Sequence, residues 1–136
     1  MERVINNRIL SFVDPHLPME QPGFRAGRST LDQVALLTSD IEESFANREK
    51  AGLVLVDLSA AYDTVWYRGL ILKLLGIISC KHMVRVIREL IRNRQFEVKL
   101  RSLISKKRCL KNGVPQGSVL APMLFNVYTS DLPETT

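Results

Sequence analysis

Two aspartates follow a strongly apolar segment near the middle of the chain and could bind a metal ion. Residues 53–56 read Leu-Val-Leu-Val, which predicts a strand buried on both faces, and Asp57 stands where this strand would end. Asp63 follows six residues later. A carboxylate at the rim of a rigid strand is a suitable ligand for a hard cation such as Mg²⁺. The same segment also suits a turn carboxylate that caps a helix starting near Ser59, so two interpretations stay open.

A second candidate segment, residues 112–118, reads Asn-Gly-Val-Pro-Gln-Gly-Ser and precedes a predicted helix that Ser118 would cap. Backbone amides at a helix N-terminus and the amide side chain of Gln116 can bind polar groups. Gly117 has no side chain, so a flat base or a sugar could approach the backbone closely. The alternative is an ordinary helix-capping loop.

A third segment, residues 23–29, has two glycines and resembles a phosphate-binding P-loop. A P-loop needs a strand before it, four residues between the glycines and a lysine. Here three residues separate the glycines, an arginine replaces the lysine, and prolines precede the segment. A P-loop nucleotide-binding protein is therefore a weak alternative, which a strand at residues 18–23 would favour.

Positive charge is concentrated in one part of the 136-residue chain. Residues 81–111 contain eleven basic and two acidic side chains, a balance of +9, whereas the rest of the chain has a balance of −4. Such a polarised chain favours contact with a polyanion. Arg85, Arg88 and Arg92 fall on one helix face, and without aromatic residues among them the patch favours phosphate contacts over base stacking. The alternative is a solvated helix followed by a charged hairpin.

The remaining pattern predicts an α+β fold with a small sheet backed by helices, either one compact domain or part of a larger one. Helices are expected at residues 2–13, from Ser29 or Thr30 onwards, around 70–75, at 80–93 and after Ser118, and Gly76 is expected to end the helix around 70–75. Residues 14–28 are expected to form a loop. Residues 95–101 are expected to form a half-buried strand that returns as a hairpin through a turn near 102–105.

Composition excludes several classes of protein. No segment is apolar for long enough to span a membrane, and residues 1–10 show no signal-peptide pattern. Cys80 and Cys109 lack metal-ligand spacing and are expected to be reduced thiols, and the two histidines stand alone. We therefore expect an intracellular protein, nuclear or cytoplasmic, that is not secreted.

Three segments in order resemble conserved blocks of reverse transcriptases. They are residues 21–34 (QPGFRAGRSTLDQV), 56–65 (VDLSAAYDTV) and 113–125 (GVPQGSVLAPMLF). The most similar group is that of non-LTR, LINE- or jockey-type retrotransposons of animals. The resemblance covers nearly the whole chain and implies part of a right-hand polymerase, with residues 1–50 on the fingers side (lower fingers) and residues 51–136 in the first part of the palm.

The resemblance also implies roles for individual residues of the second block. Asp57 matches the first metal-binding aspartate of the palm, and the main-chain carbonyl of Leu58 matches a further ligand of Mg²⁺. Tyr62 matches the aromatic residue beneath the incoming sugar, where its ring would collide with a 2′-hydroxyl group. Tyr62 could equally be a core aromatic residue, and both roles are compatible. For Asp63 we expect a structural or capping role.

In the other two blocks, Gln116 and Gly117 match the palm loop that lines the nucleotide and the template base. Arg25 and Arg28 match the fingers block, where contact with template or phosphate competes with a salt bridge between the loop and a helix end. An RNA template, a DNA primer and deoxynucleoside triphosphates are the implied partners.

One family block has no counterpart in the chain. The Tyr- or Phe-Ala-Asp-Asp hairpin normally follows a stretch such as residues 130–133, and no Asp-Asp pair occurs here. One aspartate cannot hold two magnesium ions. We therefore expect part of a polymerase that is inactive by itself and lacks the remainder of the enzyme; the alternative is a nucleic-acid-binding remnant without catalysis.

Overall fold

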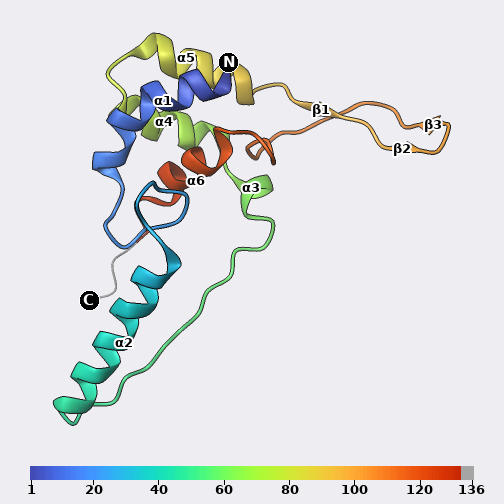
Figure 1. The fold of residues 1–136 in the computed structure, drawn as a ribbon. Helices are drawn as coiled ribbons and strands as arrows, with labels where there is room; N and C mark the ends of the chain where they lie inside the picture. Colours follow the sequence, from blue (N-terminus) through green and yellow to red (C-terminus); the bar gives the residue numbers. More distant parts are fainter. Residues whose placement is uncertain (133–136) are drawn as a thin grey trace. The chain divides into compact units, whose positions relative to one another are not determined.

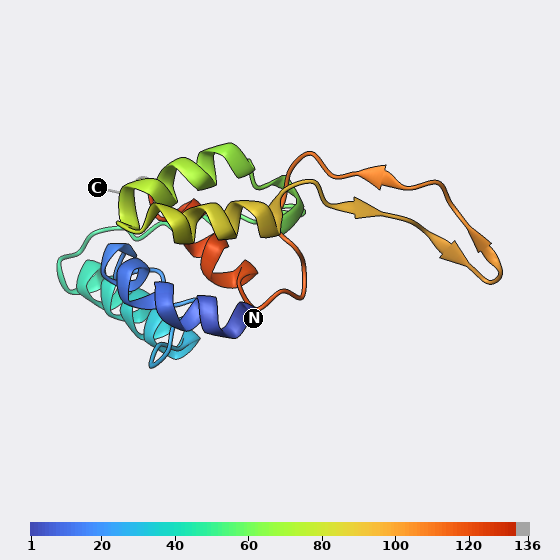
Figure 2. The same cartoon turned by 90° about the horizontal axis from the view of Figure 1, so that it is seen from above.

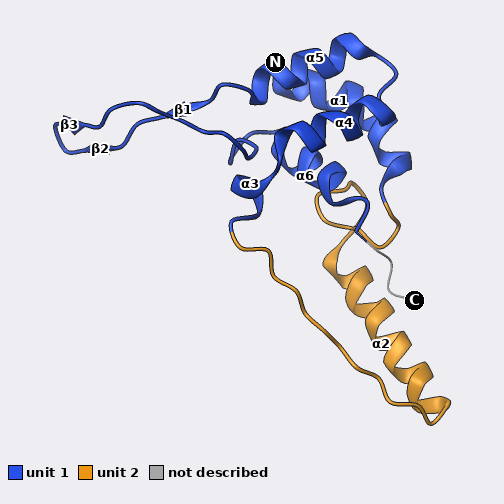
Figure 3. Ribbon diagram, turned by 180° about the vertical axis from the view of Figure 1, so that it is seen from behind, with its two compact units in different colours: residues 1–17, 60–136 blue, residues 18–59 orange. Residues whose placement is uncertain are grey.

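The computed structural model describes residues 1–132 and contains two compact units. The first unit comprises residues 1–17 and 60–136, and the second comprises residues 18–59 (Figure 3). As predicted, the chain combines helices with small antiparallel sheets (Figure 1).

Four helices form the core of the first unit: α1 (Glu2–Val13), α4 (Tyr67–Ile77), α5 (Lys81–Ile91) and α6 (Ala121–Thr129). Their apolar faces meet in a single cluster, in which α4 packs against both α5 and α6. The predicted inward residues of α5 are buried, with Val84, Ile87 and Ile91 each at most 5% exposed. Burial of this kind contributes about 1.5–3 kcal/mol per large side chain, so these helices are held mainly by packing.

Helix boundaries follow the predicted pattern with two corrections. Gly76 does not end α4, because the helix continues to Ile77. Ser118 does not cap α6: the helix begins at Ala121 with Leu120 as its N-cap residue and a proline in the first turn. Proline suits the first turn because its missing N–H group has no partner there in any case.

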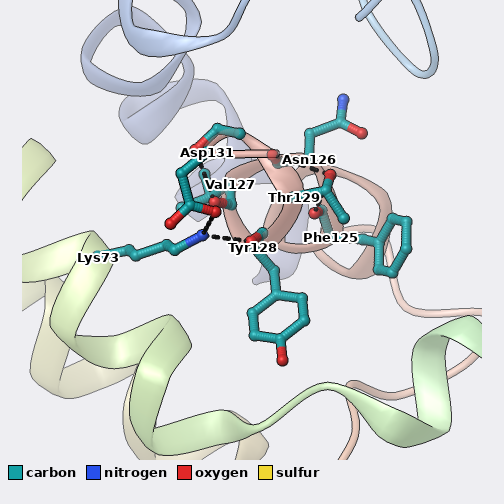
Figure 4. Close-up of polar contacts among 8 residues, drawn as sticks. Lys73, Phe125, Asn126, Val127, Tyr128, Thr129 and Asp131 are labelled. Carbon is teal, nitrogen blue, oxygen red and sulfur yellow. Dashed lines mark hydrogen bonds and ion pairs between the residues drawn. The ribbon is translucent and has the colours of Figure 1, made fainter. Parts of the chain in front are cut away.

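Lys73 of α4 ties this helix to the end of α6. Its ammonium group donates to the carbonyl of Tyr128, forms an ion pair with Asp131, and lies 5.4 Å from the centre of the Tyr128 ring (Figure 4). The hydrogen bond from Lys73 lowers the pKa of the Asp131 carboxyl group below its usual value. This contact fixes the chain direction as it leaves α6.

The predicted hairpin is present, but it is not half-buried. Strands β1 (Gln95–Phe96) and β4 (Arg108–Cys109) pair antiparallel, as do β2 (Lys99–Leu100) and β3 (Leu103–Ile104). Every strand residue is exposed, and the hairpin projects away from the helices (Figure 2). The expected sheet backed by helices is therefore wrong for the described residues, because the apolar face of the hairpin meets no helix there.

The second unit contains helix α2 (Thr30–Ala46), with Ser29 as its N-cap residue, one of the two predicted starts. Ser29 and Asp32 form a reciprocal capping box, with the Ser29 amide 2.7 Å from a carboxylate oxygen of Asp32. No residue of α2 is buried, although its sequence has an apolar stripe. Within residues 18–59, the stripe is therefore not covered by a packed core.

Residues 53–57 do not form the predicted strand. The segment has neither helix nor strand structure, and Val54, Leu55 and Val56 are each more than 80% exposed. A strand requires a hydrogen-bonding neighbour, and none is present for this segment within residues 1–132. Asp57 consequently does not stand at the edge of a sheet in this structure.

Candidate active site

The short helix α3 (Ala61–Thr64) carries Tyr62 and Asp63. Ala60 is its N-cap residue, in a left-handed conformation with φ of +52°, and no side chain caps the helix, so the interpretation of Asp57 as a helix-capping carboxylate is wrong. A non-glycine residue in this conformation costs about 1–2 kcal/mol. The Thr64 hydroxyl donates to the carbonyls of Ala60 and Ala61, which helps to close this single turn.

The loop at Gly113 and Val114 is docked directly on α3. The Gly113 amide donates to the Val65 carbonyl at 2.7 Å, and the Val114 amide donates to the Tyr62 carbonyl at 2.8 Å. Gly113 has a φ of +89°, and a Cβ atom there would lie 2.9 Å from backbone atoms of both Tyr62 and Asp63. Only glycine permits this approach, so the structure brings together two of the segments singled out in the sequence.

Tyr62 also contacts helix α6 through its aromatic ring. Its ring lies 5.2 Å from the ring of Phe125 at an interplanar angle of 59°. Such tilted pairs add about 0.5–1.5 kcal/mol beyond the area they bury. Tyr62 is half-buried and packs against the core cluster, so its predicted role as a core aromatic residue is confirmed and leaves part of the ring accessible.

Gln116 and Gly117 are exposed between two anchored ends of the loop. One end is the docked pair at Gly113 and Val114; at the other, Glu2 of α1 accepts hydrogen bonds from the Ser118 hydroxyl and the Val119 amide, both at 2.8 Å. Gly117 has a φ of +82°, and nothing lies within 4 Å of where a Cβ atom would be. The loop therefore presents an open backbone surface on a fixed support.

Arg94 fixes the same loop from the side of the hairpin. Its guanidinium group donates to the carbonyls of Gly113 at 2.6 Å and Asn112 at 3.1 Å, and to the Ile91 carbonyl at 3.3 Å. A planar fork of donors can satisfy several carbonyls at once, which the single ammonium group of lysine cannot do with the same geometry. Arg94 thus links the end of α5 to the loop.

Replacing Arg94 by alanine is expected to lower the free energy of unfolding by about 1.5–3 kcal/mol, because charged hydrogen bonds to carbonyls in a part-buried loop are lost. Arg94→Lys should recover only part of this loss. Chemical denaturation followed by circular dichroism measures both values. The matched control is Arg92→Ala, since Arg92 makes only a 3.9 Å contact with Glu89; an equal loss in this control would contradict the assignment.

Asp57 and Leu58 belong to the second unit, so the structure describes them separately from Tyr62 and the loop. Both are exposed and lie in a segment without helix or strand. Within residues 1–132 no group of three or more His, Cys, Asp or Glu side chains could hold a metal ion. A carboxylate and a carbonyl are nevertheless the hard oxygen donors that Mg²⁺ prefers, together with waters and phosphates.

Arg25 and Arg28 lie in the loop before α2. Arg25 donates to the carbonyls of Pro18 at 2.6 Å and Gln21 at 3.4 Å, and therefore holds the loop together. Arg28 is exposed and reaches the sulfur of Met19 at 3.3 Å. Residues 18–23 form turns and irregular chain without a strand, so the structure does not support the P-loop alternative.

The basic residues of α5 share one face, as predicted. Arg85 and Arg88 line one hollow of the surface, and Arg88 and Arg92 line the next. Arg88 pairs with Glu89 at 2.9 Å while remaining partly exposed. Exposed pairs of this kind contribute about 0–1 kcal/mol, so phosphate oxygens could replace the glutamate at little cost.

Two supporting residues of the site carried no signal in the sequence. Glu2 contacts residues 118 and 119, more than one hundred positions away. Arg94 is one of eleven basic residues in its region and has no distinguishing neighbours there. The contact of Phe125 with the Tyr62 ring could have been expected only from the place of Phe125 on the apolar side of α6.

Comparison with known proteins identifies the class. The profile of a family described as reverse transcriptase (RNA-dependent DNA polymerase) matches residues 1–136. The chain therefore belongs to the reverse transcriptase family, and the predicted resemblance is confirmed. Neither the P-loop alternative nor that of a non-catalytic remnant is favoured by this match.

The relatives come from mobile elements of flies. The chain is 40% identical over 134 residues to a probable RNA-directed DNA polymerase from transposon BS of Drosophila melanogaster. It is 33% identical over 135 residues to the corresponding protein of the X-element of the same species, and 34% identical over 135 residues to the RNA-directed DNA polymerase of the mobile element jockey of Drosophila funebris. These matches cover 97–98% of the chain but only 15% of each relative.

Proposed function

We propose that this chain belongs to an RNA-directed DNA polymerase of the jockey type, in which it forms the surface beneath the incoming nucleotide and contributes the first metal ligand. The observation that supports this most is the docking of Gly113 and Val114 on the turn that carries Tyr62. This contact places an accessible aromatic ring next to a glycine-containing loop that is fixed at both ends. A sugar on the ring and a base pair over the loop would be held in a defined geometry.

Asp57 and the Leu58 carbonyl would hold Mg²⁺ in this proposal. When bound, the ion would neutralise charge on the transferred phosphate and lower the pKa of the attacking hydroxyl group. The carboxylate of Asp57 would hold and orient the cation together with waters and substrate phosphates. We expect catalysis only where further carboxylates complete the site, since two ions need more ligands than Asp57 and Leu58 provide.

The finer assignments follow the same proposal. Residues 1–50 would belong to the lower fingers and residues 51–136 to the palm, with Gln116 and Gly117 facing the nucleotide and the template base. Arg25, Arg28 and the basic face of α5 would contact nucleic acid, and an RNA template, a DNA primer and deoxynucleoside triphosphates would be the partners.

No helix in residues 1–132 is long and apolar enough to cross a membrane. We propose an intracellular location, nuclear or cytoplasmic.

Tyr62 gives the sharpest test of this function. In a chimera in which residues 1–136 replace the matching segment of the transposon BS polymerase, Tyr62→Ala should reduce the preference for deoxynucleotides over ribonucleotides by about 5- to 150-fold. The reason is that a clash worth ~1–3 kcal/mol between the ring and a 2′-hydroxyl group is removed. Primer extension on an RNA template with each kind of nucleotide measures the ratio.

Tyr62→Phe is the control for this experiment, because it keeps the ring and its contact with Phe125. Tyr62→Phe should prefer deoxynucleotides over ribonucleotides as strongly as the unsubstituted chimera does. An unsubstituted chimera without RNA-templated extension, while the parent polymerase is active, would contradict the proposed function itself. Extension with unchanged discrimination in Tyr62→Ala would contradict the role of the ring.

A further inference from the structure

The face formed by α4 and α5 contains three hollows that share lining residues. Two of them, of about 680 Å³ and about 560 Å³, are both lined by Trp66, Tyr67, Arg68 and Arg92. The third, about 300 Å³, adjoins the second at Arg88 and continues along α5 to Lys81. Shared linings make these hollows one trough, which runs from residues 109–113 after the hairpin along α4 and α5 to Lys81.

The trough carries positive charge and no lining carboxylate. Its basic side chains are Arg68, Lys81, Arg85, Arg88, Arg92 and Lys111. No Asp or Glu lines any of the three hollows, although Glu89 lies beside the trough and pairs with Arg88. Such a row of cations is complementary to a chain of phosphates, because each contact releases counterions from the polyanion.

Trp66 gives the trough an aromatic surface that the sequence pattern of α5 did not suggest. Trp66 is 53% exposed as a residue, and its indole ring lies across the first turn of α4, where Gly69 leaves room for it. A Cβ atom on Gly69 would lie 2.5 Å from Cε3 of this ring. Glycine inside a helix costs about 0.5–1 kcal/mol relative to alanine, and here it allows a large ring to rest against the helix and still line two hollows.

We propose that this trough binds a single strand of RNA, with a base stacked on Trp66 and the flanking phosphates on Arg68 and Arg92. The inference rests on the proposed function, in which an RNA strand is the template, and adds a surface to it that the resemblance did not assign. A single strand fits better than a duplex, because stacking on a protein ring requires a base that is free of its neighbours.

The test uses the 136-residue chain, in which Trp66 is the only tryptophan. Titration with a short unstructured RNA such as oligouridylate should quench its fluorescence, with an affinity that falls as salt rises. Trp66→Ala should weaken binding by roughly 5- to 100-fold, the range for loss of one stacked base, whereas Trp66→Phe should keep most of the affinity. Fluorescence anisotropy of a labelled RNA measures binding by all variants.

Two further variants separate stacking from general effects. Gly69→Ala keeps the tryptophan but displaces its ring, and should reduce both quenching and affinity. Phe96→Ala removes an exposed aromatic residue of the hairpin outside the trough and should leave affinity unchanged. Circular dichroism establishes that each variant remains helical.

Several outcomes would overturn the inference while leaving the polymerase proposal intact. They are RNA binding without quenching, affinity unchanged in Trp66→Ala, equal quenching by a double-stranded RNA, and tighter binding of single-stranded DNA than of RNA of the same sequence. Absence of any RNA binding at low salt would also overturn it. The polymerase proposal itself is tested separately by the primer-extension chimera.

Discussion

Gly113→Ala is expected to lower the free energy of unfolding by roughly 2–5 kcal/mol. Two costs add: a left-handed conformation costs about 1–2 kcal/mol for alanine, and forcing an extra methyl group into a packed site costs about 1–3 kcal/mol. The methyl group would meet main-chain atoms of Tyr62 and Asp63 at 2.9 Å, and a backbone cannot rotate aside as a flexible side chain can. Domains of this kind are stabilised by about 5–15 kcal/mol in total, so the loss is large.

Gly117→Ala is the matched control, because its φ of +82° is similar but the space around it is open. It should lose only the conformational part, about 1–2 kcal/mol. Urea denaturation followed by circular dichroism compares the two variants. Equal losses would show that the loop is not docked on α3 as the structure describes.

The difference between Gly113 and Gly117 illustrates which features of this loop can be predicted from the sequence and which cannot. The pattern of residues 112–118 predicted a tight loop that exposes Gly117, and this is confirmed. It gave no reason to distinguish Gly113, because the clash involves the backbone of a segment fifty positions earlier. Contacts between distant segments depend on how the helices pack, which local spacing does not encode.

Helix α5 and the hairpin after it were predicted closely because their signals are local. Apolar residues at helical spacing define the buried side of α5, and alternation followed by polar turn residues defines the hairpin. The degree of burial was predicted wrongly for the hairpin. Alternation shows that one face is apolar, but it does not show whether anything covers that face.

Residues 53–57 failed as a predicted strand for a related reason. Apolar β-branched residues favour strands only where another strand supplies hydrogen-bond partners, and the described residues supply none to this segment. The segment is also among the blocks that resemble reverse transcriptases. Its apolar side chains are exposed here, so neither burial nor hydrogen bonding within the described residues stabilises a strand.

Asp57→Asn is expected to abolish nucleotide incorporation by the chimera described above, with a loss of about 10³-fold or more. Asparagine keeps the size of the side chain and one oxygen atom but removes the negative charge that would bind Mg²⁺ in the proposed function. Metal assistance is worth several kcal/mol of transition-state stabilisation, and each 1.36 kcal/mol changes the rate tenfold. The affinity of the chimera for primer and template should be retained, since Asp57 contacts the cation in this account.

Magnesium-dependent primer extension on an RNA template, compared between Asp57→Asn and Asp63→Asn in this chimera, is the decisive test of Asp57 as a metal ligand. Each variant loses one exposed carboxylate, and the two positions are six residues apart. We expect Asp57→Asn to be inactive at any magnesium concentration and Asp63→Asn to extend the primer like the unsubstituted chimera. Normal extension by Asp57→Asn would contradict the assignment of this aspartate as the metal ligand of the polymerase.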